Sequence, residues 1–108
     1  MGVEVHVDIE RGTGLIGIIH GAKPGKAIAL RADIDALPVQ EHNTFDFKSN
    51  VDGKMHACGH DGHMAILLGA AKMLTAMKDR IEGDVYLAFQ PAEETGAGAP
   101  DFMKFDNW

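Results

Sequence analysis

The chain has 108 residues and a formal net charge of −6, from 10 basic and 16 acidic side chains. Its length fits a single domain, and an acidic chain without a basic cluster has no electrostatic means of binding nucleic acid or an anionic membrane surface. A single cysteine excludes an internal disulfide, and neither a membrane span of roughly 18 apolar residues nor a signal peptide is recognisable, so a cytoplasmic protein is expected.

The first third of the chain predicts a set of short strands. Apolar and polar side chains alternate at the start, which is typical of a half-buried strand, and two further β-rich runs follow glycine-containing turns. The predicted strands cover residues 3–9, 15–19 and 27–32. Short turns between consecutive strands favour an antiparallel meander. Pro38 then ends regular pairing, and the polar residues 39–57 are expected to form a long loop, a kind that often carries function.

A helix and a buried strand are predicted in the second half. From Asp61 the apolar side chains recur with a helical period as far as a stop at Gly83. The expected apolar face consists of Met64, Leu67, Leu68, Ala71, Leu74, Met77 and Ile81. The unbroken apolar run 85–89 is typical of a buried strand, and a strand that follows a helix in this way indicates an α/β sheet. The tail after Gly96 shows no firm pattern.

These elements predict an α/β fold with a mixed sheet, an N-terminal antiparallel meander and a helix on one face. A single helix covers only one face of a sheet, so the apolar strand 85–89 would be left bare on the other. Such an arrangement is awkward for a complete protein. The simplest explanation is that residues 1–108 are a fragment of a larger domain.

Side chains that bind transition metals are concentrated in residues 55–66. Cys58 and His60 are separated by one residue, which places both side chains on the same side of an extended segment and lets them share one ion. Two alternatives remain open for the cysteine. Near a helix start it can be a reactive thiol whose pKa is lowered by the helix dipole, or it can be an inert buried thiol. Metal binding is the interpretation that we favour.

The residues that flank this pair have competing interpretations. Asp61 is a candidate helix N-cap, or a partner that fixes a ligand imidazole in one tautomer. His63 and His56 are candidate ligands, although a histidine on the first turn of a helix more often packs or faces solvent. The remaining histidines have no partner nearby in sequence and are expected at the surface; they are His6, His20 and His42.

Two pairs of carboxylates lie at predicted strand ends. Glu93 and Glu94 follow the strand 85–89, at the edge where open α/β sheets usually hold ligands. On a solvated loop such a pair has no special role, whereas beside a cation one carboxylate can bind the ion while the other takes a proton from water. Asp33 and Asp35 end another strand on a common face, and they are either part of the same site or ordinary turn residues.

Three segments, in this order and spacing, resemble the amidohydrolase branch of the dinuclear metallopeptidases. They are Ala-Leu-Arg-Ala-Asp-Ile-Asp-Ala-Leu-Pro at 29–38, the metal-binding segment at 55–65 and Phe-Gln-Pro-Ala-Glu-Glu at 89–94. The branch includes bacterial N-acyl-amino-acid amidohydrolases, hippurate hydrolases and plant hydrolases of auxin conjugates. The resemblance implies a partial zinc-peptidase-like catalytic domain over residues 1–108, truncated at both ends. The family's smaller dimerising domain and its two downstream histidine ligands would be missing.

The resemblance also implies roles for individual side chains. Cys58 and His60 match metal ligands, with Cys58 suited to bridge two ions, and Glu94 matches a further ligand. Glu93 matches the general base that activates the bridging water. Asp35 matches the aspartate that, in the wider clan, supports a ligand histidine.

The implied activity is hydrolysis of the amide bond of an N-acyl amino acid or related conjugate by a metal-activated water. The implied cofactors are two divalent ions of manganese, zinc or cobalt, and the parent protein is expected to be a homo-oligomer with a small-molecule substrate. Asp33 occupies the position of the clan's histidine ligand and is therefore not assigned as a ligand. Two alternatives are a non-catalytic fragment that binds metal weakly and a thiol-dependent protein built on Cys58.

Overall fold

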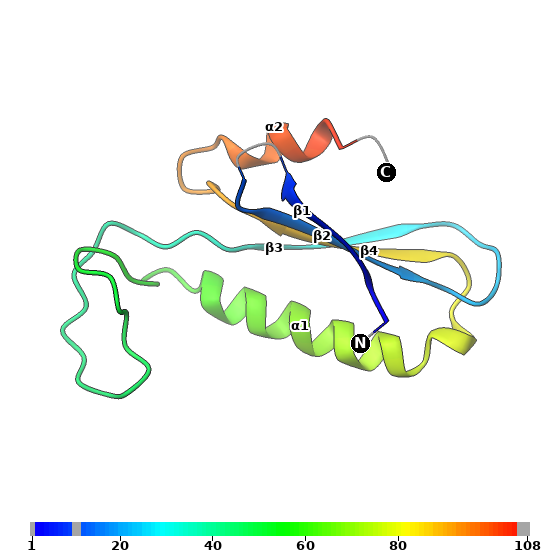
Figure 1. Cartoon of the computed structure of the whole chain (residues 1–108), viewed down its shortest axis with the longest axis horizontal. Coiled ribbons are helices and arrows are strands. Elements are labelled where there is room, and N and C mark those ends of the chain that lie inside the picture. The colour runs from blue at the N-terminus through cyan, green and yellow to red at the C-terminus, as the bar shows by residue number, and fades with distance from the viewer. Residues whose placement is uncertain (1, 10–11, 106–108) are drawn as a thin grey trace.

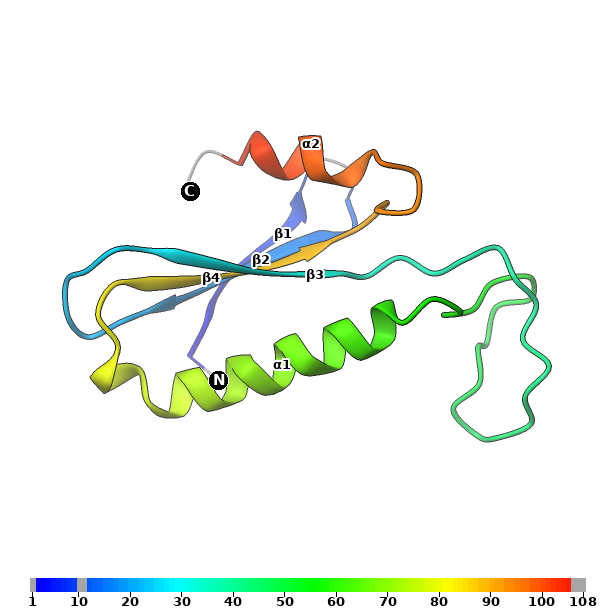
Figure 2. The same cartoon turned by 180° about the vertical axis from the view of Figure 1, so that it is seen from behind.

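In the part of the chain that the structure describes, residues 2–9 and 12–105, four strands form one open sheet with helices on both faces. The structure is a computed structural model. The elements are β1 (Glu4–Ile9), β2 (Gly14–His20), β3 (Ile28–Asp33), α1 (His60–Ala76), a short 3-10 helix (Lys78–Arg80), β4 (Asp84–Gln90) and α2 (Gly98–Met103). Figures 1 and 2 show α1 along one face of the sheet and α2 over the other. None of the described helices is both long enough and apolar enough to cross a membrane.

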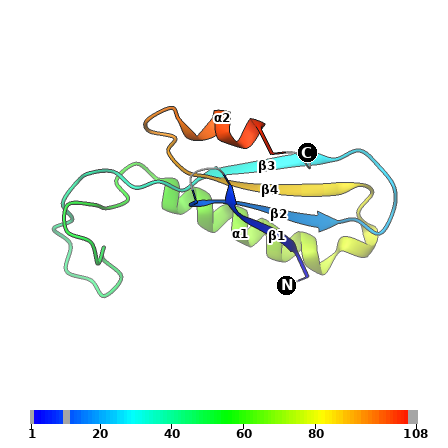
Figure 3. The same cartoon turned by 45° about the horizontal axis from the view of Figure 1, so that its top comes forward.

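The sheet is mixed, and its strand order is β1-β2-β4-β3 (Figure 3). β2 pairs antiparallel with β1 and with β4, whereas β3 pairs parallel with β4 through the crossover helix α1. The predicted α/β fold with a mixed sheet is therefore confirmed, but the meander holds only for β1 and β2. The placement of the third strand beside the second is wrong. β4 carries an unbroken apolar run that needs cover on both faces, so it takes an interior position and separates β3 from β2.

The larger core lies between the sheet and α1. It consists of Ile19, Ala32, Leu67, Ala71, Val85, Leu87 and Phe89. The helix begins at His60, one residue before the predicted start, and ends at Ala76, well before Gly83. Leu68 and Met77 belong to the predicted apolar face, yet they are 53% and 38% exposed. Only the central stripe of that face contacts the sheet, which leaves its borders outside the core.

The second face of the sheet is covered by α2, which the sequence pattern does not predict. The smaller core there consists of Ile16, Ile18, Ala88 and Phe102. A Cβ atom at Gly14 would lie 2.7 Å from the Phe102 ring, so the glycine leaves the room that the ring needs. The expectation of a bare face on the central strand is therefore wrong, and residues 87–90 are buried. A helix of six residues is too short to produce a periodic signal.

A row of charged side chains crosses the end of the sheet opposite the carboxyl ends of β3 and β4. The carboxylate oxygens of Glu4 lie 2.6 Å from Nε2 of His6 and 2.6 Å from Nε2 of His20, whose Nδ1 lies 3.3 Å from the Asp84 carboxylate. The expectation that His6 has no partner nearby in sequence is wrong, because Glu4 is only two residues away. The partners of His20 are distant in sequence and come beside it through the pairing of β2 with β1 and β4. The hydrogen bond with Glu4 raises the pKa of His20, and the same bond lowers the pKa of Glu4.

This contact is expected to make stability depend on pH. Protonated His20 stabilises the fold fully below its unfolded pKa of about 6.5, and the contribution is lost as the pH rises through the raised folded-state pKa. Glu4 contributes above its unfolded pKa of about 4.3, and its contribution is lost as the pH falls through the lowered folded-state pKa. We therefore expect the melting temperature to fall above about pH 6.5, and to fall less in His20→Gln. His42→Gln, in the exposed loop, is the control, and identical pH profiles for both variants would contradict the assignment.

Candidate metal centre

The predicted site residues meet at one edge of the sheet. β3 and β4 are parallel, with Asp33 opposite Gln90, so both strands end at this edge. Asp35 lies just beyond β3 and residues 93 and 94 follow β4, while α1 begins nearby with His60 (Figure 1). The carboxyl ends of parallel strands are where open α/β sheets bind ligands.

His60 is at the centre of this cluster. Its side chain is only 5% exposed, and Nδ1 lies 3.0 Å from the carbonyl oxygen and 3.1 Å from Oδ1 of Asp35. With its proton on Nδ1, His60 donates to Asp35 and directs Nε2 toward three other carboxylates. These are Asp33 Oδ2 at 3.4 Å, Glu94 Oε1 at 3.6 Å and Glu93 Oε2 at 3.8 Å. An imidazole held by a carboxylate on one nitrogen and free on the other is the usual arrangement of a metal-binding histidine.

Cys58 completes a set of three donors. One donor atom from each of Cys58, His60 and Glu94 lies within 4.8 Å of the other two. The thiol is exposed, which contradicts the inert buried alternative. The hydrogen bond to Glu94 and the charge of that carboxylate raise the pKa of Cys58, whereas a reactive thiol needs a lowered pKa. A bound cation would reverse this effect, so the surroundings of the thiol fit a metal-binding role best.

Asp35 connects two of these donors. While its Oδ1 contacts His60, its Oδ2 accepts a hydrogen bond from the backbone N–H of Glu94 at 3.0 Å. Burial would raise the pKa of Asp35, but backbone N–H groups, foremost that of Glu94, outweigh burial and lower it. Burial would likewise lower the pKa of His60, but the charges of Asp33 and Asp35 outweigh it and raise that pKa. Asp35 is thus placed to hold both the His60 ring and the backbone of Glu94.

A tight turn after β4 carries the two adjacent glutamates. Ala92, directly before Glu93, has a φ of 55°, which is uncommon for a residue with a side chain. Its carbonyl oxygen accepts hydrogen bonds from the N–H groups of Ala97 at 3.1 Å and Gly98 at 3.3 Å. A Cβ atom at Gly98 would lie 1.7 Å from the carbonyl oxygen of Pro91, so the turn can close only with glycine there. The strained residue therefore sets the direction in which Glu93 leaves the sheet.

The start of α1 differs from the prediction. Its N-cap is Gly59, with a φ of 123° and no side-chain hydrogen bond, so the N-cap role of Asp61 is wrong. The side chain of Asp61 is exposed, and among the described residues it forms no hydrogen bond with an imidazole. His56 is half-buried, and its Nδ1 atom is buried without a hydrogen-bond partner in the described part of the chain.

His63 and Asp33 form a contact that was not predicted from the sequence. Nδ1 of the half-exposed His63 lies 2.5 Å from Oδ1 of the buried Asp33, and the His60 and His63 rings are stacked with centroids 5.6 Å apart. Asp33, His60 and His63 thus form a second group whose donor atoms lie within 4.8 Å of one another. The sequence does contain a signal for this group. Asp33 and Asp35 are two residues apart at a strand end, and His60 and His63 are three apart on a helix; either spacing places the two side chains on the same side of their element.

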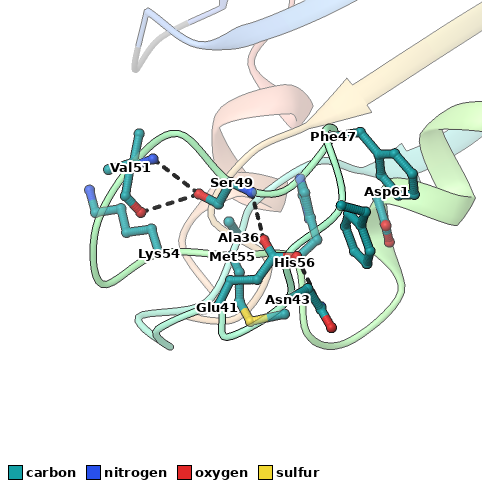
Figure 4. Close-up of a pocket in the computed structure, with 11 residues that line it drawn as sticks. Ala36, Glu41, Asn43, Phe47, Ser49, Val51, Lys54, Met55, His56 and Asp61 are labelled. Carbon is teal, nitrogen blue, oxygen red and sulfur yellow. Dashed lines mark hydrogen bonds between the residues drawn. The ribbon is translucent and has the colours of Figure 1, made fainter.

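A cavity of about 530 Å³ lies in the loop between β3 and α1 (Figure 4). The loop is closed at its base by backbone hydrogen bonds of 2.9 and 3.1 Å between Leu37 and Met55, and the predicted long loop at 39–57 is confirmed. Inside it, the Glu41 carboxylate accepts a hydrogen bond of 2.6 Å from the backbone N–H of Ser49. The cavity is lined by Ala36, Glu41, Asn43, Phe45, Phe47, Ser49, Val51, Lys54, Met55, His56 and Asp61. It is therefore distinct from the cluster of donors around His60.

Comparison with known proteins identifies the family. Residues 29–107 match the family model described as peptidase family M20/M25/M40. The chain is 56% identical over 96 residues to thermostable carboxypeptidase 1 of Saccharolobus solfataricus, a match that covers 89% of this chain and 24% of that relative. It is 47% identical over 100 residues to the N-acyl-L-amino acid amidohydrolase of Geobacillus stearothermophilus, covering 91% of this chain and 27% of that relative.

A solved structure supports the same assignment. A Bacillus subtilis protein described as a dinuclear metal-binding peptidase of family M20 has a TM-score of 0.87 and 46% sequence identity, covering 94% of this chain and 29% of its own. The chain spans about a quarter of the length of the curated relatives that it matches. All three segments of the resemblance lie inside the residues that match the family model. The chain belongs to peptidase family M20/M25/M40, a family of metal-dependent hydrolases.

Proposed function

We propose that this chain carries metal-binding side chains and the general base of an enzyme that hydrolyses the amide bond of N-acyl amino acids or related conjugates. The observation that supports this most directly is the convergence of Cys58, His60 and Glu94 within 4.8 Å, with Glu93 beside them. A thiol, an imidazole and a carboxylate form a donor set that suits zinc and related divalent metals. Similarity to an amidohydrolase and to a carboxypeptidase supports an amide bond as the target.

The proposed cofactor is a pair of divalent ions of manganese, zinc or cobalt. The description of a similar solved structure as dinuclear supports the number of ions. Cys58, His60 and Glu94 are the side chains of this chain that would hold the ions. When bound, the ions would polarise the substrate carbonyl and make water more acidic.

The residues of this chain would then transfer a proton. Glu93 is partly exposed, and its Oε2 lies 3.8 Å from Nε2 of His60, which places it beside the donors without pairing closely with any of them. Its carboxylate would accept a proton from the attacking water and pass it to the leaving amine nitrogen. Asp35 would hold Nδ1 of His60 throughout, so that Nε2 stays directed at the centre. We also propose that the parent protein is cytoplasmic and homo-oligomeric.

Chelation and metal addition test this function. We expect a hydrolase that contains this chain to cleave N-acetyl and N-benzoyl amino acids, to lose turnover after treatment with a chelator, and to regain it with manganese, zinc or cobalt. The 108-residue chain alone is expected to bind metal but to turn over below about 1 s⁻¹, the low end of ordinary enzyme rates. Turnover should be slow because the described residues supply few metal-binding atoms for two ions, and because the exposed Cys58 leaves the cluster open to solvent.

Two results would contradict the proposal. Turnover that survives chelation but is lost on alkylation of Cys58 would indicate a thiol-dependent enzyme. Metal binding by the complete hydrolase without turnover of any amide in the panel would indicate a non-catalytic role.

A further inference from the structure

Asp33 is a buried carboxylate that divides its two oxygens between two imidazoles. Its side chain is 9% exposed, with Oδ1 at 2.5 Å from Nδ1 of His63 and Oδ2 at 3.4 Å from Nε2 of His60. Arg31 is a more distant neighbour, with Nη2 at 3.7 Å from Oδ2, and its Nε instead donates to the Gln90 side chain at 2.7 Å. The carboxylate therefore faces His60 on the same nitrogen that a metal ion would use.

The contact repeats an arrangement that is already present in the neighbouring aspartate–histidine pair. Asp35 holds Nδ1 of His60, and Asp33 holds Nδ1 of His63. The aspartates are two residues apart at the end of β3 and the histidines are three residues apart on the first turn of α1. The two units differ in exposure, because His60 is buried and the His63 side chain is 55% exposed. His63 is thus placed to hold Asp33 from the solvent side.

Burial of Asp33 has no evident benefit for the fold alone. A buried carboxylate loses hydration, and a neutral group of the same shape would avoid that cost. The negative charge is useful if a cation occupies the position in front of Nε2 of His60. The His63 ring would contribute to the same arrangement, because it holds Oδ1 of Asp33 and leaves Oδ2 facing the proposed metal position.

We propose that Asp33 is a positioning residue of the metal centre and that His63 orients it. The inference rests on the proposed function, since it requires an ion at Cys58, His60 and Glu94. Asp33 supplies a fixed negative charge beside Nε2 of His60, and the hydrogen bond from His63 prevents its carboxylate from rotating away. Residues that surround the ligands of a metal centre typically change metal affinity 10–100-fold when they are replaced.

Cobalt binding by the 108-residue chain tests this role. Cobalt(II) bound to a thiolate gives a charge-transfer absorption band that reports Cys58, and competition with a coloured chelator gives the affinity. We expect Asp33→Asn to keep the band but to bind cobalt roughly 10–100-fold more weakly. His63→Ala should weaken binding in the same direction, and His63→Gln, whose amide can still donate to Asp33, should restore most of the loss. Asp61→Asn, an exposed aspartate on the same helical turn, should bind like the unmodified chain.

The outcomes separate this inference from the proposed function. If the unmodified chain shows no thiolate band, the proposed centre is contradicted and the role of Asp33 with it. If the band is present and neither Asp33→Asn nor His63→Ala changes the affinity, the positioning role alone is overturned. Should Asp33→Asn fail to fold, the surface variants His63→Ala and His63→Gln decide, and equal affinity in both would overturn the role.

Discussion

Replacing Glu93 by glutamine is expected to lower the turnover of a hydrolase containing this chain by about two to four orders of magnitude. Glutamine has the same shape but cannot accept a proton at neutral pH. Metal content should remain unchanged, because the donor group with Cys58 and His60 contains Glu94 and not Glu93. The measurement is kcat for an N-acyl amino acid together with metal analysis of the purified protein.

Glu94→Gln provides the contrast, and Glu82→Gln the control. Glu94 belongs to the donor set with Cys58 and His60, so its loss of charge should release metal before it affects proton transfer. Glu82 is exposed and lies just before β4, away from the carboxyl ends of the strands, and its variant should behave like the unmodified protein. Equal metal loss in Glu93→Gln and Glu94→Gln would show that the two roles are assigned wrongly.

Asp35→Ala is expected to lower the affinity for divalent metal roughly 10–100-fold. The substitution removes the acceptor for Nδ1 of His60 and also the acceptor for the backbone N–H of Glu94. Both donors would then sample several orientations, and ordering them again would oppose metal binding. The measurement is calorimetric titration with zinc or manganese, with thermal unfolding as a check that the fold is intact.

Asp35→Asn and Asp46→Ala make this test specific. Asparagine keeps one acceptor oxygen, which can serve either His60 or Glu94 but not both, so an intermediate affinity is expected. Asp46 lies in the exposed loop and its replacement should leave affinity unchanged. If Asp35→Ala binds metal as tightly as Asp46→Ala does, the link between His60 and Glu94 has no influence on the centre.

The sequence predicts those features of this chain that depend on neighbouring residues. The helical period locates α1 to within one residue at its start, and the apolar run 85–89 locates β4. Cys58, His60 and Glu94 could be grouped because their segments flank one helix and strand, and the structure brings them together. The roles assigned to these side chains remain predictions.

Features that depend on contacts between distant segments could not be predicted in the same way. β3 lies at the edge of the sheet because β4, which needs cover on both faces, takes the interior position beside β2. The turns between consecutive strands give no information about this order. α2 is held by the packing of Phe102 against Gly14, a contact across most of the chain. The pairing of His63 with Asp33 depends on the register between α1 and β3, and an alternation pattern gives no information on register.

The backbone bridge between Leu37 and Met55 has a consequence for how the chain can diverge. It fixes the two ends of the loop next to Asp35 and Cys58, so residues 38–54 leave and re-enter the domain at one place. Lengthening a loop whose ends are already joined costs little free energy, roughly 0.6 kcal/mol for each doubling of its length. Insertions, deletions or grafted sequences in this loop should therefore be tolerated, so that the lining of its cavity can be exchanged while the donor atoms stay where they are.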